Sequence, residues 1–123
     1  MKRVLVADDE MMNRDLIRKV LTKEGLGVIE AINGKEALEI LKRDKIDLVL
    51  MDLMMPVMDG FEAIGIIRKE RCYDALPLIA VSALDDRQTY QRVLQLGADG
   101  CITKPFELSF LVACVKSALE RER

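Results

Sequence analysis

The sequence predicts an α/β domain in which five parallel strands form one sheet and five helices cover both of its faces. Three observations lead to this class. Short apolar runs, of the kind that buried parallel strands use, alternate with longer segments of helical periodicity. Glycine, proline and Asn-Gly or Asp-Gly pairs separate these segments. The alternation continues along the whole chain, so each strand returns to the sheet through a right-handed crossover, and a doubly wound sheet results.

The first half of the chain supplies two strands and two helices. We expect the first strand at residues 3–7 and a helix at about 13–24, because apolar residues recur there at helical spacing. The second strand is expected at 27–31. Asn33 is followed three residues later by Glu36, which is the spacing of a capping box. The second helix is therefore expected to begin at Asn33.

The second half continues the same alternation. Proline and glycine again mark where each segment begins or ends. The expected elements are a strand that runs through 46–51 into Asp52, a helix opened by Asp59-Gly60, a strand at 78–81 that ends at Ser82, a helix at about 85–96, a strand at 100–103 and a last helix at about 106–121.

Composition predicts one globular domain that spans residues 1–123. Half of the residues are hydrophobic and a third are charged, and the formal net charge is −2. No basic stripe stands out, so we expect no direct binding of nucleic acid. No apolar run is long enough to cross a bilayer, so we expect no membrane attachment.

The chain has three cysteines and no histidine. An odd number of cysteines without metal-type spacing indicates reduced thiols and predicts a cytoplasmic protein. The lack of histidine excludes a Ser-His-Asp triad, a histidine-ligated zinc site and an internal phosphohistidine.

Polar groups follow the last apolar residues of four predicted strands. Asp8 and Asp9 follow the first strand, Asp52 the third, Ser82 the fourth and Lys104 the fifth. The carboxyl ends of parallel strands meet at one edge of the sheet, where such folds bind ligands. We therefore expect these five residues to share one crevice.

Three neighbouring carboxylates need a counter-charge. Taken alone, Asp8-Asp9 would be an ordinary acidic turn before a helix. Beside Asp52, each carboxylate pair would repel by about 3 kcal/mol at an effective dielectric constant near 20. An oxygen-only ligand set suits Mg²⁺, with Mn²⁺ as a substitute, whereas zinc would need histidine or paired cysteine.

Lys104 and Ser82 complete a set of groups suited to phosphoryl transfer. Lys104 lies between an apolar strand and Pro105, whose peptide bond can be cis at low cost, and this favours a fixed inward side chain over a surface lysine. Ser82 offers a hydroxyl, although it could instead cap the following helix. A cation, an ammonium and a hydroxyl can each hold a phosphoryl oxygen. An ionised Asp52 could then attack in line without a general base.

The ordered motifs resemble the receiver domain of two-component response regulators, and the resemblance covers nearly the whole chain. The segments that carry it are 4–10, 47–60, 77–83 and 97–106. The resemblance implies the flavodoxin-like topology and a signalling domain, not an enzyme beyond its own phosphorylation and dephosphorylation. It also implies a phosphohistidine donor on a sensor histidine kinase or a histidine phosphotransfer protein, and a downstream effector protein or effector domain.

The resemblance implies a role for each residue of the crevice. Asp52 would be the phosphoacceptor, and Asp9 and Asp52 would bind magnesium directly together with the Met54 backbone carbonyl. Asp8 would act on the metal mainly through water. The phosphoryl oxygens would be contacted by Ser82, Lys104 and the backbone N–H groups of Met54 and Ala83.

One position departs from the family pattern. Cys101 stands where an aromatic residue usually lies, three residues before the lysine. We therefore expect phosphorylation to be reported by a shift of the fourth helix, whose apolar anchors are few: Tyr90, Val93 and Leu94. The wide apolar arc of the last helix is most simply a core face; alternatively, it forms a partner surface with the fourth helix and fifth strand, with Phe110 as a candidate contact. A homodimer through that surface is left open.

Other functions compete with this interpretation. An aspartate-nucleophile phosphatase of the haloacid-dehalogenase type would need an Asp-x-Asp motif and a cap insertion, and the chain has neither. A flavin- or nucleotide-binding relative would need a Gly-rich loop after a strand, whereas Gly25-Leu26-Gly27 precedes one. A docking module that never needs phosphate stays open because of Cys101.

Overall fold

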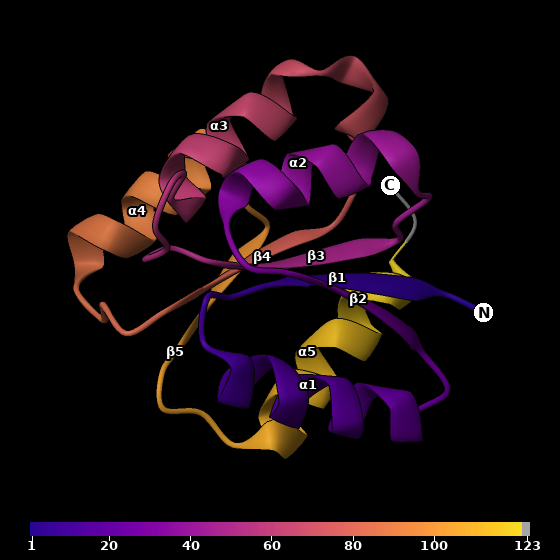
Figure 1. The fold of residues 1–123 in the computed structure, drawn as a ribbon. Coiled ribbons are helices and arrows are strands. Elements are labelled where there is room, and N and C mark those ends of the chain that lie inside the picture. Colours follow the sequence, from indigo (N-terminus) through magenta and orange to yellow (C-terminus); the bar gives the residue numbers. More distant parts are fainter. Residues whose placement is uncertain (122–123) are drawn as a thin grey trace.

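The computed structural model describes residues 1–121 and has one five-stranded sheet in which all neighbouring strands run parallel. The strand order is β2-β1-β3-β4-β5, so the chain winds from the centre to one edge and then to the other (Figure 1). This confirms the predicted doubly wound sheet. The strands are β1 (Arg3–Ala7), β2 (Gly27–Ala31), β3 (Leu48–Asp52), β4 (Leu78–Ser82) and β5 (Gly100–Thr103).

Five α-helices cover the two faces of the sheet. They are α1 (Met11–Lys23), α2 (Gly34–Arg43), α3 (Gly60–Lys69), α4 (Arg87–Leu96) and α5 (Leu108–Glu120). Helices α1 and α5 lie on one face, and α2, α3 and α4 lie on the other (Figure 1). A short 3₁₀ helix, η1 (Arg71–Tyr73), which the sequence analysis did not predict, follows α3.

The strands lie within two residues of their predicted positions, and three helix starts differ from the predicted ones by two residues. Helix α1 begins two residues earlier than expected, because the Glu10 backbone N–H donates to Asp8 Oδ1 and the chain turns directly into the helix. Helix α4 begins later, because Asp86 is its N-cap and accepts from the Thr89 backbone N–H. Helix α5 also begins later, after Glu107.

Two apolar cores, one on each face, hold the layers together. The three central strands are almost wholly buried, and their side chains alternate between the two cores. The core beneath α2, α3 and α4 includes Leu5, Met51, Ile64 and Ile67, and the core beneath α1 and α5 includes Val6, Leu21, Leu50 and Leu111. Because a buried apolar core packs against each face, the carboxyl ends of the strands are held in place at one edge.

Glycine is required where α3 starts beside β3. A Cβ atom on Gly60 would overlap the backbone carbonyl of Asp52. The Gly60 N–H donates to the Leu53 carbonyl at 3.0 Å, and Asp59 caps the helix by accepting from the Glu62 N–H. This close approach fixes the backbone on the carboxyl side of Asp52.

The carboxyl end of α4 is fixed by a second glycine and by Arg68. Gly97 has a φ of 112°, in the left-handed region, and a Cβ there would lie 2.5 Å from Arg68 Cγ. The Arg68 guanidinium donates to the carbonyls of Gly97 (2.8 Å), Tyr73 (2.6 Å) and Leu76 (2.8 Å), and it pairs with Asp99 at 3.1 Å. One largely buried cation thus joins α3, η1, α4 and the start of β5.

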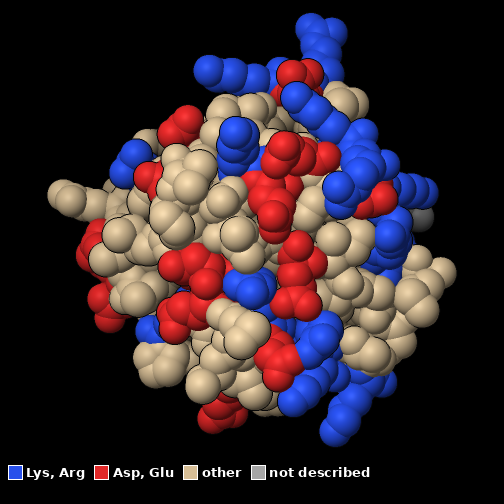
Figure 2. Space-filling view, in the orientation of Figure 1, with Lys and Arg blue, Asp and Glu red and all other residues tan. Residues whose placement is uncertain are grey.

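The helix orientation produces opposite charges at the two edges of the sheet. Basic residues occupy the last turns of α1, α2 and α3, among them Lys23, Lys42, Arg43 and Lys69. Figure 2 shows Lys and Arg along the side on which the N-terminus lies, and acidic side chains gathered near the middle of the same face. Because helices run antiparallel to the strands, their positive N-terminal ends lie at the carboxyl edge, where anionic groups are favoured.

Candidate functional site

Three carboxylates meet at the carboxyl edge of the sheet. Asp8 follows β1 and Asp52 ends β3, and these strands are neighbours, with Ala7 opposite Met51. Asp8 and Asp52 are 2% and 5% exposed, whereas Asp9 is exposed. Ligand oxygens of the three side chains lie within 4.8 Å of one another, which is close enough for one metal ion. The predicted acidic cluster is therefore present.

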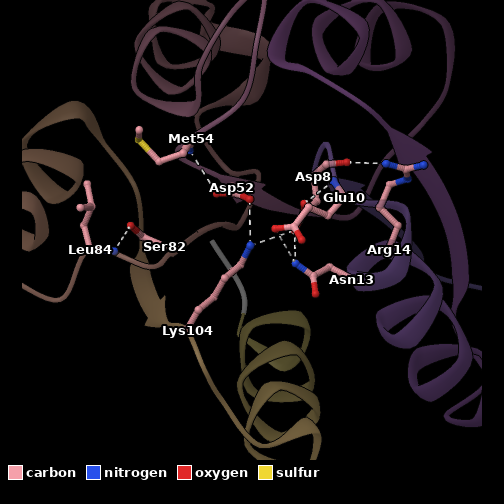
Figure 3. Close-up of polar contacts among 9 residues, drawn as sticks. All are labelled: Asp8, Glu10, Asn13, Arg14, Asp52, Met54, Ser82, Leu84 and Lys104. Carbon is pink, nitrogen blue, oxygen red and sulfur yellow. Dashed lines mark hydrogen bonds and ion pairs between the residues drawn. The ribbon is translucent and has the colours of Figure 1, made fainter.

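Lys104 reaches this cluster from the end of β5. Its Nζ donates to Asp52 Oδ2 at 2.9 Å and to Asp8 Oδ2 at 3.1 Å (Figure 3). The Lys104 backbone N–H donates to the Ser82 carbonyl at 2.7 Å, and the Lys104–Pro105 peptide bond is cis. The side chain is 18% exposed, so it points inward as the sequence predicts. One ammonium is shared between two buried carboxylates.

The second oxygen of Asp52 is held by backbone. The Met54 N–H donates to Asp52 Oδ1 at 3.1 Å (Figure 3). Burial raises the pKa of Asp52, hydrogen bonds from Lys104 and Met54 partly oppose the rise, and the charge of Asp8 adds to it. Burial alone would lower the pKa of Lys104, but its contacts with Asp52 and Asp8 outweigh burial and raise it. The two carboxylates therefore favour the protonated form of Lys104.

Ser82 lies beside Asp52 at the end of β4 and is fully buried. Its Oγ accepts a hydrogen bond from the Leu84 backbone N–H at 2.8 Å. The alternative role of Ser82 as the cap of α4 is wrong, because Asp86 caps that helix. Ala83 and Leu84 follow in the exposed loop between β4 and α4, which borders the site. The structure thus brings every predicted site residue to one edge.

The sequence analysis missed Asn13 and Arg14, which contact Asp8, and Glu30, which pairs with Arg14. Asn13 Nδ2 lies 3.4 Å from Asp8 Oδ2, and Arg14 Nη1 donates to the Asp8 carbonyl at 2.7 Å. Arg14 Nε also donates to Glu30 Oε1 at 3.1 Å. A signal was present, because Glu30 is the one charged residue in the otherwise apolar strand β2. A charged side chain in such a strand calls for a partner of opposite charge.

Cys101 and α4 lie next to the site on the outer part of the sheet. Cys101 is half-buried against the core beneath α2, α3 and α4, and this burial raises the pKa of its thiol. Within α4, Val93 is fully buried, but Tyr90 and Leu94 are 50% and 37% exposed. The prediction that Tyr90 and Leu94 anchor the helix is therefore wrong, because α4 flanks the edge strand and buries only a narrow stripe. Together with Phe110 and Cys114, Tyr90 and Cys101 line a groove between α4, β5 and α5.

Fold and site together define a class: a doubly wound α/β domain that gathers three carboxylates and a lysine at the carboxyl edge of its sheet. The chain belongs to the response regulator receiver domain family, whose model matches residues 4–116. It is thus a receiver domain of two-component signal transduction, as the sequence motifs predicted.

Similar proteins agree with this assignment. Response regulator RR06 of Streptococcus pneumoniae is 43% identical over 118 residues, which are 96% of this chain and 53% of that protein. Sensor histidine kinase CheAY of Helicobacter pylori is 40% identical over 121 residues, or 97% of this chain and 15% of that protein. The receiver domain of the Francisella response regulator 1452 matches with a TM-score of 0.92 at 33% identity, covering 98% of both chains.

Two further findings bear on the whole protein. The chain spans about half the length of response regulator RR06 and of the similar regulator ycf27 of Porphyridium aerugineum. Among residues 1–121, no helix has both the length and the apolar character needed to cross a membrane.

Proposed function

We propose that Asp52 accepts a phosphoryl group from a phosphohistidine on a sensor histidine kinase or a histidine phosphotransfer protein. The observation that carries this proposal is the setting of Asp52: a carboxylate held by Lys104 at 2.9 Å and by the Met54 N–H at 3.1 Å, beside two further carboxylates. This arrangement is costly for the fold alone and suits a site that stabilises developing negative charge. The chain has no histidine, which agrees with a donor on another protein.

The proposed metal is Mg²⁺, with Mn²⁺ as a substitute, held by Asp8, Asp9, Asp52 and the Met54 carbonyl. The donor set fits, since all the side-chain ligands are carboxylate oxygens and they lie within 4.8 Å of one another. When bound, the cation supplies positive charge that offsets the carboxylates and the phosphoryl oxygens. Asp8, which already accepts from Lys104, would act mainly through water.

The protein groups then divide the work of transfer. An oxygen of Asp52 forms the new O–P bond while the N–P bond of the donor breaks, and no proton leaves Asp52 because the carboxylate attacks in its ionised form. Lys104 neutralises one phosphoryl oxygen. The N–H groups of Met54 and Ala83 and the hydroxyl of Ser82 hold the others; Ser82 Oγ accepts from Leu84, so its O–H is available to donate.

The output of the domain is proposed to be a change at the surface formed by α4, β5 and α5, which an effector protein or effector domain binds. The weak anchoring of α4 supports this, because Val93 and Thr89 alone are buried along its length. The domain would act as one unit over residues 1–123 and modify only itself, without a separate substrate. The free thiols of Cys72, Cys101 and Cys114 support a reducing, cytoplasmic location.

Acetyl phosphate tests the central step without a partner kinase. Incubation with Mg²⁺ should add one phosphoryl group that hydroxylamine removes, and mass spectrometry should detect it. Asp52→Asn should abolish the mass increase. Asp74→Asn, which removes an exposed carboxylate far from the site, should retain it. A wild-type protein that folds but gains no mass would overturn the proposal and favour a docking module that works without phosphate.

A further inference from the structure

We propose that Arg14 is a positioning residue of this site: by holding the Asp8 carbonyl, it fixes the Asp8–Asp9 peptide in the orientation that directs the Asp9 carboxylate toward the divalent cation. The inference rests on the proposed function, because it concerns the metal ligands named there. It adds a residue from α1 that touches neither the metal nor the phosphoryl group.

Asp9 is the one carboxylate of the cluster without side-chain support. Asp52 accepts from Lys104 and from the Met54 N–H, and Asp8 accepts from Lys104 and the Glu10 N–H. Within residues 1–121, no hydrogen bond or ion pair holds the exposed Asp9 carboxylate. The point from which this carboxylate extends is therefore set by the backbone on either side of Asp9.

Arg14 controls that backbone. Asp8 is the first residue beyond β1, and its N–H still donates to the Ala31 carbonyl of β2 at 3.0 Å. Its carbonyl receives Arg14 Nη1 at 2.7 Å (Figure 3). This carbonyl belongs to the planar peptide whose nitrogen is that of Asp9. Holding the oxygen therefore restrains rotation of this peptide and, with it, the position of the Asp9 Cα atom from which the carboxylate extends.

The guanidinium is itself fixed by Glu30. Arg14 Nε donates to Glu30 Oε1 at 3.1 Å, and the Arg14 side chain is only 12% exposed. Glu30 lies in β2 opposite Val6 of β1, so its carboxylate is anchored to the sheet. The rigid, planar fork of an arginine can satisfy both acceptors at once, whereas a lysine ammonium is a single point. The backbone before Asp9 is thus connected to β2 through two contacts, from Arg14 to the Asp8 carbonyl and from Arg14 to Glu30.

Charge and position predict opposite effects on metal affinity. Arg14 is a cation, so if its charge alone mattered, removing it would strengthen the binding of Mg²⁺. If Arg14 positions Asp9, removing it weakens binding, and loss of such an outer partner typically costs about 10–100-fold in metal affinity. The sign of the change therefore separates the two roles.

The experiment measures the dissociation constant of Mg²⁺ alone by calorimetry for the wild-type chain and three variants. We expect weakening by about 10-fold or more for Arg14→Ala. Arg14→Lys, which keeps the charge but loses the fork, should weaken binding by at least about threefold. The matched control is Arg18→Ala, which removes the same charge from the same helix, 3.8 Å from Glu30 Oε2, without touching Asp8. It should stay within about twofold of wild type.

A second readout needs no metal. The Glu10 amide donates to Asp8 Oδ1, and its hydrogen exchange in EDTA should be faster in Arg14→Ala than in Arg18→Ala. If Arg14→Ala fails to fold, Arg14→Lys carries both measurements. The inference would be overturned if folded Arg14 variants kept the wild-type Mg²⁺ affinity and the wild-type amide exchange rates. Tighter Mg²⁺ binding by these variants would also overturn it. Neither result would affect the proposed function. A wild-type chain that binds no Mg²⁺ would instead overturn the metal site of the proposed function, and the inference with it.

Discussion

Replacing Lys104 by methionine should destabilise the metal-free domain by about 3 kcal/mol, the loss typical when one partner of a buried ion pair is removed. Lys104 Nζ lies 2.9 Å from Asp52 and 3.1 Å from Asp8, and those residues are 5% and 2% exposed. At such distances each attraction amounts to about 5 kcal/mol at an effective dielectric constant of 20. Without the ammonium, the two carboxylates also repel each other in a site that water reaches poorly.

The loss should be smaller than the sum of both attractions, because one carboxylate can take up a proton. The pKa of Asp52 is already raised by burial, so Asp52 is the carboxylate expected to take up this proton and relieve the repulsion. Mg²⁺ should then reduce the difference in unfolding free energy between Lys104→Met and the wild type. A cation that binds the folded state stabilises it, and in the variant no ammonium competes with Mg²⁺ for the carboxylates.

Urea denaturation at pH 7, in EDTA and in Mg²⁺, measures both effects. Lys19→Met is the control, because Lys19 is 68% exposed and pairs with Asp15 on the surface, so its loss should cost less than about 1 kcal/mol. The reasoning would be refuted if Lys104→Met matched Lys19→Met in EDTA. A difference in unfolding free energy between Lys104→Met and the wild type that became larger in Mg²⁺ would also contradict the reasoning.

Three further predictions concern the rate of acyl phosphate hydrolysis, the contribution of Arg68 to stability, and the pH dependence of the α4 N-cap. Met54 and Leu84 flank the proposed acyl phosphate with apolar side chains that cannot orient water, so Met54→Asn with Leu84→Glu should speed its hydrolysis, measured after acetyl phosphate loading. Arg68→Ala should lower the free energy of unfolding in urea by about 3 kcal/mol, because buried carbonyls and a carboxylate lose their shared donor; a loss below 1 kcal/mol would contradict this. Hydrogen bonds from Thr89 lower the pKa of Asp86, so its stabilising effect is complete above the unfolded-state pKa of about 3.8 and is lost as pH falls through the folded-state pKa. The stability deficit of Asp86→Ala should therefore shrink in acid, and a deficit independent of pH would argue against this cap.

The fold was readable from the sequence because its signals are local and repeat. A buried parallel strand leaves an unmistakable apolar run, and the strand ends then bring Asp8, Asp52 and Lys104 together whatever the details of packing. The same logic accounts for the capping of α2, where Asn33 accepts from the Glu36 N–H and Glu36 accepts from the Ile32 N–H.

Contacts that depend on how a helix lies on the sheet were not readable. Arg14 reaches Asp8 and Glu30 only because α1 packs across β1 and β2, and its place in the helix gives no hint of this. Tyr90 and Leu94 fit the helical period but are exposed, because β5 is an edge strand and offers α4 little surface. Periodicity indicates which residues share a face, and only the packing partner decides how much of that face is buried.

The hydrogen bond from Arg68 to the Gly97 carbonyl fixes one end of α4, so the helix can rotate about that end. The helix has 10 residues, so its two ends are about 15 Å apart. Arg68 clamps the Gly97 end to α3, whereas the Asp86 end leads into the exposed loop that begins beside Ser82. A rotation of only about 10° about the clamped end would carry the first turn of such a helix about 2.5 Å, which is comparable with the length of one hydrogen bond. Such a displacement, starting at the proposed phosphoacceptor edge, would be largest in the first turn of α4 and would decrease toward the Gly97 end.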